Sequence, residues 1–146
     1  MKHNLCIVGY GGMGGWHANH ALKSDVVNLV GIYDIKKERS ELAEKNGIKA
    51  YSSFQEVLDD KNIEIITIAT PNDIHKEQAI ACLAAGKNVI SEKPVTLSSK
   101  DLAEMIEASE KYQRIFTVHQ NRRWDIDYLA MKQVYDSGQI GDVFNI

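Results

Sequence analysis

The sequence is poor in the residues that mark several specialised protein classes. Its 146 residues include only two cysteines and two prolines. Cys6 and Cys82 both lie inside apolar segments without CxxC spacing, so we expect buried free thiols rather than a disulfide or a metal site. No repeat, low-complexity tract or Ser/Gly-rich linker interrupts the chain, and no internal domain boundary is therefore visible.

A large excess of positive or negative charge is also lacking. Seventeen Lys and Arg residues stand against twenty Asp and Glu residues, for a net charge of -3, without a run of five like charges or a basic stripe. Such a surface has little to neutralise phosphates with, so we expect no nucleic-acid partner. The apolar run within Met1–Val8 is too short for a signal peptide or a membrane span. We therefore expect a cytoplasmic protein without a membrane partner.

What is present is typical of one globular domain. With 44% hydrophobic and 25% charged residues, a chain of this length should bury about 68 to 70% of its unfolded surface. Short runs rich in Val and Ile alternate with stretches of helical spacing, a pattern typical of parallel strands joined by crossover helices. It predicts a single α/β domain with a doubly wound, mostly parallel sheet. The expected strands are Leu5–Val8, Val26–Tyr33, Ile63–Ala69, Asn88–Ser91 and Ile115–Val118.

Helices are expected between and after these strands. Ser53 with Glu56, and Ser98 with Asp101, have the spacing of capping boxes at helix starts. The expected helices are about Met13–Lys23, Lys36–Asn46, a short one after Ser53 through Asp59, Ile74–Ala85, one from Ser98 to Gln113, and Ile126–Ser137.

The last residues suggest that a second domain follows. Asp142–Ile146 reads as the opening of a further strand, which brings the strand signals to six. A finished domain seldom ends on an unpaired apolar strand. We therefore assign residues 1–140 to one domain and 141–146 to the start of a missing C-terminal domain.

A glycine-rich motif follows the first expected strand. Gly9, Gly11 and Gly14 give G-x-G-x-x-G at a strand-to-helix turn, with Gly12 and Met13 inside it. Such a turn lets the backbone approach a pyrophosphate, which the free N–H groups of the helix N-terminus then bind. The alternative is a merely flexible turn.

An acidic residue stands where the second strand ends. Asp34, followed by Ile35, lies 20 residues after Gly14, the spacing at which a carboxylate accepts hydrogen bonds from the ribose of a bound dinucleotide. A carboxylate there repels a 2′-phosphate, which favours NAD over NADP. Lys36 and Lys37 follow closely and could compensate, so NADP stays the alternative.

Three further polar segments follow expected strands, at the sheet edge where α/β proteins bind ligands. They are Ala69-Thr70-Pro71-Asn72 with His75, then Glu92-Lys93-Pro94, and finally Gln120-Asn121-Arg122. With G-x-G-x-x-G-x-x-H at Gly9–His17, these segments make nearly the whole chain resemble the N-terminal NAD(P)-binding Rossmann domain of the Gfo/Idh/MocA (glucose-fructose oxidoreductase and inositol dehydrogenase) family.

The resemblance implies an NAD(P)-dependent dehydrogenase that transfers a hydride between nicotinamide and a CH–OH group of a sugar, inositol or related polyol. It makes Lys93 the catalytic lysine, places Glu92 near the nicotinamide and has Pro94 fix the turn through a cis bond. The remaining residues implied to border the cofactor are Ala69, Thr70, Pro71, Asn72, His75 and Gln120, with Asn121 and Arg122 reaching toward the substrate. It makes residues 1–140 the NAD(P)-binding Rossmann domain and 141–146 the start of a missing C-terminal substrate domain with further catalytic residues, and it implies a homo-oligomer. The alternatives are an NAD(P) sensor without activity and an NAD-dependent glycosidase.

Some of these residues have simpler interpretations. Without the resemblance, Lys93 reads as a solvated lysine in a turn. Arg122 and Arg123 can bind a substrate anion or form ion pairs with nearby aspartates. His17 and His20 share a helix face, but no carboxylate or thiol close in sequence completes a metal shell, and we expect no metal.

Overall fold

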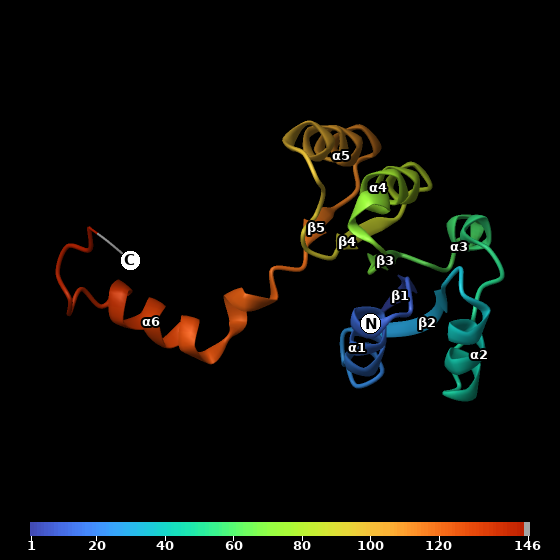
Figure 1. Ribbon diagram of the computed structural model, residues 1–146, viewed down its shortest axis with the longest axis horizontal. Coiled ribbons are helices and arrows are strands. Elements are labelled where there is room, and N and C mark those ends of the chain that lie inside the picture. Colours follow the sequence, from blue (N-terminus) through green and yellow to red (C-terminus); the bar gives the residue numbers. More distant parts are fainter. Residues whose placement is uncertain (145–146) are drawn as a thin grey trace.

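The protein folds around one parallel β-sheet. The computed structural model describes residues 1–144 and contains five strands there, in the order β2-β1-β3-β4-β5 (Figure 1). All four pairings are parallel, as expected. The strands are β1 (His3–Val8), β2 (Val27–Tyr33), β3 (Ile65–Ile68), β4 (Asn88–Ser91) and β5 (Phe116–Val118).

Helices connect the strands, close to the ranges expected from the sequence. They are α1 (Gly12–Ala21), α2 (Lys37–Lys45), α3 (Phe54–Asp59), α4 (His75–Ala84), α5 (Ser99–Tyr112) and α6 (Ile126–Asp136), with 3-10 turns η1 (Asn72–Ile74) and η2 (Asn121–Trp124). Both expected caps are present, since Ser53 accepts from Glu56 N and Ser98 from Asp101 N. The acidic side chains of the two motifs bind elsewhere than in a capping box, since the Glu56 carboxylate accepts from Ser52 and the Asp101 carboxylate accepts from Lys76.

The expected strands differ most from the observed ones at two places, whereas β1, β2 and β5 begin within two residues of the expected positions. The run Ile63–Ala69 is longer than β3, because the Ile63 amide is held in a turn by the Asp60 carbonyl. At the other end, Asp142–Phe144 form no strand, and the rest of that prediction lies outside the described residues. A sixth strand position exists elsewhere, as a single parallel bridge between Ile32 and Ala50 beside β2.

With that bridge as an outer position, the sheet has the 3-2-1-4-5-6 order of dinucleotide-binding domains. The chain leaves β1 toward β2 on one side, while β3 pairs with β1 on the other. The switch point of this order is therefore between β1 and β3, and ligands bind in the crevice outside the carboxyl ends of strands at such a point.

Alternate residues of β1 face two different cores. Ile7 packs with α1 and α2 residues such as Ala18 and Ala43. Cys6 and Val8 face the opposite way, into a larger cluster that α3, α4 and α5 supply. Both cysteines are buried and unpaired, as expected. The two layers hold the sheet rigid from both faces and so fix the loops at its edge.

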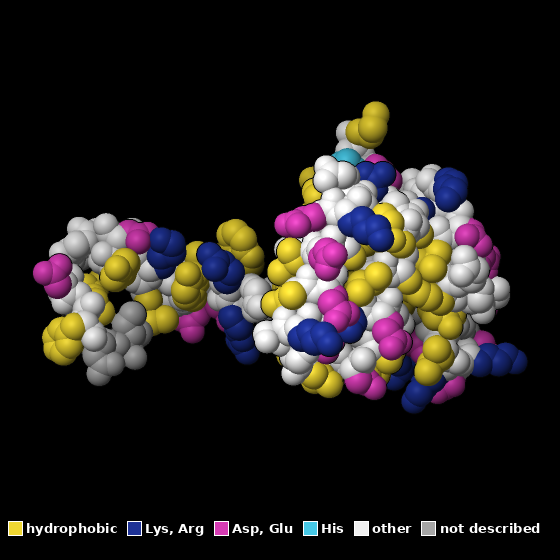
Figure 2. All heavy atoms as spheres, turned by 90° about the horizontal axis from the view of Figure 1, so that it is seen from above, with side chains coloured by type: hydrophobic (Ala, Val, Ile, Leu, Met, Phe, Trp, Pro, Cys, Tyr) yellow, Lys and Arg dark blue, Asp and Glu magenta, His cyan; other side chains and the backbone are white. Residues whose placement is uncertain are grey.

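The helix α6 lies apart from the sheet and the helices that cover it. It extends away from the body as an arm (Figure 1), and none of its residues is buried. Hydrophobic side chains lie along the arm in the space-filling view (Figure 2). Those exposed include Ile126, Leu129, Met131, Val134 and Tyr135. None of the helices in the described part of the chain is long and apolar enough to cross a membrane.

Candidate dinucleotide-binding site

The glycine loop lies between the carboxyl ends of β1 and β3. Gly9 has a φ of +92°, which disfavours any side chain, and a Cβ there would come within 2.6 Å of the Ala69 carbonyl oxygen. A Cβ on Gly14 would overlap the carbonyl oxygen of Gly9 and lie 3.6 Å from Ile7 in β1. The loop therefore folds tightly against both strands only because these residues lack side chains.

The start of α1 is open to an anion. No side chain caps it, and its first turn, which contains Gly12 and Met13, has no acidic residue. Unpaired amide hydrogens and the positive end of the helix dipole therefore face the loop. This is the arrangement that binds a pyrophosphate.

Asp34 is held rigidly beside the loop. Its carboxylate, in a residue that is 8% exposed, accepts hydrogen bonds from Tyr10 N at 2.7 Å, Lys36 N at 2.9 Å and Arg39 Nη1 at 3.0 Å. Burial opposes ionisation, but these hydrogen bonds outweigh it and lower the pKa of Asp34. Asp34 is thus a preorganised anion, next to the exposed Ile35.

The cation beside Asp34 is not one of the two lysines considered from the sequence. Lys36 contributes only its backbone N–H, and Lys37 pairs with Glu41 at 3.6 Å. Arg39 instead reaches back from α2, and its Nη1 lies 3.3 Å from where a Cβ of Gly11 would stand. The guanidinium therefore lies between the carboxylate and the phosphate loop. The spacing of Asp34 and Arg39 across a loop and a helix start gave no sequence signal for this contact.

The segment after β3 forms the other wall of the switch point. Thr70 donates its hydroxyl to Gln78 at 2.6 Å, and the Nε2 of the fully buried His75 donates to the Thr70 carbonyl at 2.9 Å. Pro71 and Asn72 are exposed in the turn that leads to α4. His75 therefore fixes the turn from below rather than facing solvent.

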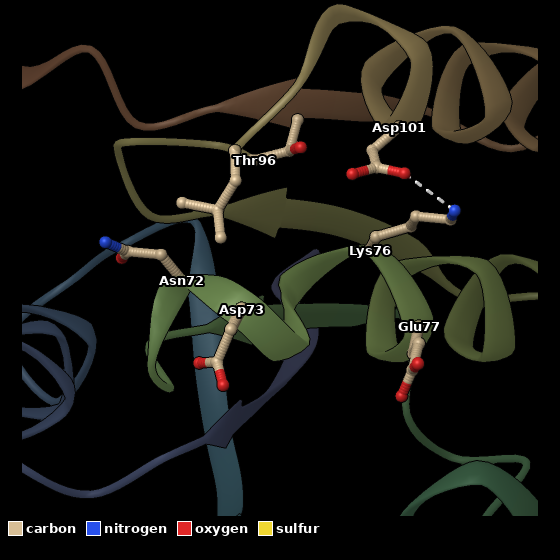
Figure 3. Close-up of a pocket in the computed structure, with 7 residues that line it drawn as sticks. Asn72, Asp73, Lys76, Glu77, Thr96 and Asp101 are labelled. Atoms are coloured by element: carbon tan, nitrogen blue, oxygen red, sulfur yellow. Dashed lines mark hydrogen bonds and ion pairs between the residues drawn. The ribbon is translucent and has the colours of Figure 1, made fainter.

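Asn72 also lines a small polar cavity of about 190 Å³ between the start of α4 and the segment before α5 (Figure 3). Lys76 crosses this region and forms ion pairs with Asp101 at 2.8 Å and Glu104 at 2.6 Å. Its ammonium is thus already neutralised, so the cavity is a weak candidate for phosphate binding.

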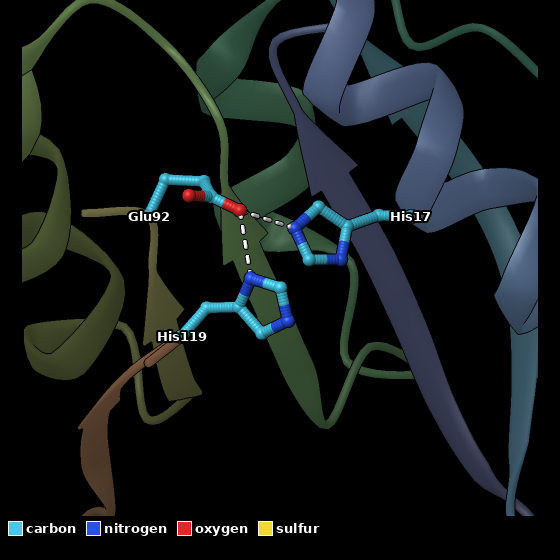
Figure 4. Close-up of side chains that lie close together, drawn as sticks. All are labelled: His17, Glu92 and His119. Atoms are coloured by element: carbon cyan, nitrogen blue, oxygen red, sulfur yellow. Dashed lines mark hydrogen bonds and ion pairs between the residues drawn. The ribbon is translucent and has the colours of Figure 1, made fainter. Parts of the chain in front are cut away.

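Glu92, at the end of β4, is the centre of a carboxylate-imidazole cluster that we name the Glu92 cluster: His17, Glu92 and His119 (Figure 4). Glu92 Oε1 accepts from His17 Nε2 at 2.8 Å and from His119 Nδ1 at 2.9 Å. Burial disfavours the charged form, but the two imidazoles and Lys93 N overcome it and lower the pKa of Glu92. Burial also lowers the pKa of His17.

This cluster corrects the sequence-based view of His17. The carboxylate that seemed to be missing comes from Glu92, 75 residues away, and the three ligand-type atoms lie within 4.8 Å of one another. The set can hold a metal ion, although hydrogen bonds already satisfy Glu92. His20 turns away and contacts the Trp16 carbonyl instead. His119 carried no sequence signal of its own, because only the fold brings the side chain of this residue, which follows β5, against His17 of α1.

The predicted catalytic and substrate residues lie at the same edge. Lys93 is exposed, donates its backbone N–H to Glu92 Oε2 at 3.1 Å and precedes a cis peptide bond to Pro94. Gln120 and Asn121 lead into η2, next to His119. Arg122 pairs with Asp125 at 2.7 Å on the surface, which is the ion-pair alternative rather than a free guanidinium.

Comparisons with known proteins agree with this geometry. The family model described as "Oxidoreductase family, NAD-binding Rossmann fold" (GFO_IDH_MocA) matches residues 3–120. The myo-inositol 2-dehydrogenase of Thermotoga maritima is 34% identical over 137 residues, 92% of this chain and 41% of the relative. A scyllo-inositol 2-dehydrogenase (NADP(+)) of Bacillus subtilis is 30% identical over 139 residues, 94% of this chain and 38% of the relative.

Solved structures show the same fold. The crystal structure of an NAD-binding protein from Listeria innocua has a TM-score of 0.94 and 45% identity, covering 99% of this chain and 43% of that one. The chain thus spans about two fifths of the length of the relatives it matches. The glycine loop, the buried aspartate, the strand order and the family match lead to one assignment: the chain belongs to the Gfo/Idh/MocA oxidoreductase family and forms its NAD-binding Rossmann fold.

Proposed function

We propose that this chain is the cofactor-binding half of an NAD(P)-dependent dehydrogenase that acts on a CH–OH group of inositol or a related sugar or polyol. The observation that carries the proposal is the uncapped start of α1, packed against a glycine loop with the fixed carboxylate of Asp34 beside it. The inositol dehydrogenases among the relatives support the substrate class.

The residues present fit a dinucleotide. Side chains on Gly9 or Gly14 would close the cradle, and the amides of the first turn of α1 would bind the pyrophosphate. Asp34 would accept hydrogen bonds from the adenosine ribose. A bound NAD(P)⁺ would supply the hydride acceptor. Lys93 would hold or move the proton of the reacting hydroxyl at its Nζ, and Glu92 would face the nicotinamide side.

Binding is the test of this proposal. NADH fluorescence should change on titration with the 146-residue chain and saturate in the micromolar range, while turnover of inositol by the chain alone should be negligible. A flat fluorescence response up to millimolar NADH would remove the proposal.

Cofactor preference gives a sharper prediction. Asp34→Ala should weaken NADH binding about tenfold, since the ribose hydroxyls lose their acceptor, and should improve NADPH binding relative to NADH. Arg39→Ala should weaken NADPH binding about tenfold and NADH binding at most threefold, because a 2′-phosphate would pair with the guanidinium. Parallel titrations with both reduced cofactors measure this. Equal losses for both cofactors in both variants would mean that the Asp34–Arg39 pair only supports the fold.

We further propose that α6 and the residues after 140 contact a substrate domain that carries the remaining substrate contacts and a subunit interface. The exposed apolar side chains of α6 and the greater length of the relatives support this. In the chain itself, Met131→Glu with Val134→Glu should leave the melting temperature within about 1 °C, because neither residue is buried. A clear fall in melting temperature would show that α6 already packs on the nucleotide-binding domain. The cytoplasmic location stays a prediction.

A further inference from the structure

Glu92 is a buried anion, and both of its carboxylate oxygens are hydrogen-bonded. Its side chain is 5% exposed, and both carboxylate oxygens accept hydrogen bonds, Oε1 from two imidazoles and Oε2 from the Lys93 backbone. An ionised carboxylate only accepts hydrogen bonds, so each imidazole presents an N–H to it. The Glu92 carboxylate is therefore a fixed negative charge at the end of β4.

The strand order places this charge relative to the cofactor. The pyrophosphate site is at the end of β1, and the adenosine carboxylate Asp34 is at the end of β2, one strand to one side. Glu92 is two strands to the other side, so about 14 Å separates the β2 and β4 ends at about 4.8 Å per strand. A dinucleotide extended over this edge with adenosine at β2 brings its nicotinamide to β3 and β4.

The nicotinamide ring is the part of the cofactor whose charge changes in the reaction. The ring is a cation in NAD⁺ and is neutral in NADH, whereas the rest of the molecule is the same. A fixed anion beside the ring therefore acts on one redox state far more than on the other. Lys93, the neighbouring cation, is exposed, so solvent screens its charge more strongly than that of the buried carboxylate.

We propose that Glu92 is a redox-state specificity residue, whose carboxylate favours NAD⁺ over NADH, and that His17 and His119 are the positioning residues that aim it. This inference rests on the proposed function, since it requires a dinucleotide at this edge. His17 is the sixth residue of α1, the helix that follows the phosphate loop, and His119 follows β5. The two hydrogen bonds thereby connect the carboxylate to α1, whose start would bind the pyrophosphate, and to the end of β5, the strand next to β4.

The experiment compares the affinities of the 146-residue chain for NAD⁺ and NADH. NADH is titrated by fluorescence, and NAD⁺ is measured by its displacement of NADH. In Glu92→Gln, which keeps the shape and removes the charge, NAD⁺ affinity should fall about tenfold, while NADH affinity should change at most twofold. Glu107→Gln makes the same chemical change on an exposed face of α5 and should leave the affinity ratio as in the unmodified chain.

The positioning residues have their own readout. His119→Gln keeps an N–H donor and should preserve the affinity ratio, whereas His119→Ala should lower the NAD⁺ preference about threefold because Glu92 loses one of its two imidazole partners. His119 is partly exposed, so both variants should fold even if Glu92→Gln does not. Thermal unfolding shows whether each variant is folded.

The outcomes separate the two claims. An equal loss of both affinities in Glu92→Gln, or an unchanged ratio in Glu92→Gln or in His119→Ala, would overturn the redox-state role while leaving cofactor binding intact. Absence of binding of either nucleotide to the unmodified chain would instead overturn the proposed function, and this inference with it.

Discussion

Replacing Gly14 by alanine should reduce NADH affinity by at least a hundredfold. The added Cβ would overlap the carbonyl oxygen of Gly9, a backbone atom that cannot move without opening the turn. Gly9 in turn packs against the Ala69 carbonyl in the wall after β3, so the loop has no room to yield. Shifting it would move the α1 amides away from the pyrophosphate. NADH fluorescence titration measures the loss, and thermal unfolding reports the accompanying destabilisation.

Gly15 is the matched control. It is the next residue in the same helix turn, yet a Cβ there meets no atom within 4 Å. Gly15→Ala should therefore leave NADH affinity within about threefold and raise the free energy of unfolding by up to about 1 kcal/mol, because alanine is the better helix former. Similar affinities in the two variants would mean that close packing at Gly14 is not what shapes the cradle.

The local features of this fold were predictable from the sequence because each rests on neighbouring residues. Val and Ile runs gave the strands, and Ser53 and Ser98 gave two helix starts that the structure confirms. The glycine spacing and Asp34 likewise lie within one strand-helix-strand unit. Errors arose where tertiary contacts contribute, as at the turn that keeps Ile63 out of β3, where the distant Lys87 donates its ammonium to the carbonyls of both Asp60 and Ile63.

The side-chain partners in the candidate site were not predictable in this way. Arg39 meets Asp34 only because α2 turns its first residues back over the loop. His17, Glu92 and His119 are far apart in the sequence and meet because α1 begins, and β4 and β5 end, at one edge of the sheet. Hydrophobic periodicity places elements in a sheet, but it carries no information about which polar side chains meet above its edge. The charge environment of the site therefore had to come from the structure.

Lys93→Ala, made in the enzyme together with its substrate domain, should lower kcat about a thousandfold. A positioned proton donor or acceptor contributes roughly 10² to 10⁴ in rate, and Lys93 is the exposed amine that follows Glu92, at the end of the site where we propose that the nicotinamide binds. Cofactor affinity should change at most threefold, because the proposed pyrophosphate and ribose contacts lie at the ends of β1 and β2. Steady-state kinetics with inositol and NAD⁺ measures kcat, and NADH titration measures affinity.

Lys100→Ala serves as the control for Lys93, since it removes an exposed lysine at the start of α5 and should leave both quantities unchanged. The role of Lys93 is identified by comparing the change in kcat with the change in cofactor affinity. A solvated lysine in a turn would leave kcat as it is, whereas a lysine that only shapes the Glu92-Lys93-Pro94 turn would change affinity and kcat together. A fall in kcat alone means that Nζ acts on the reacting hydroxyl, since the backbone hydrogen bond from Lys93 to Glu92 survives the substitution.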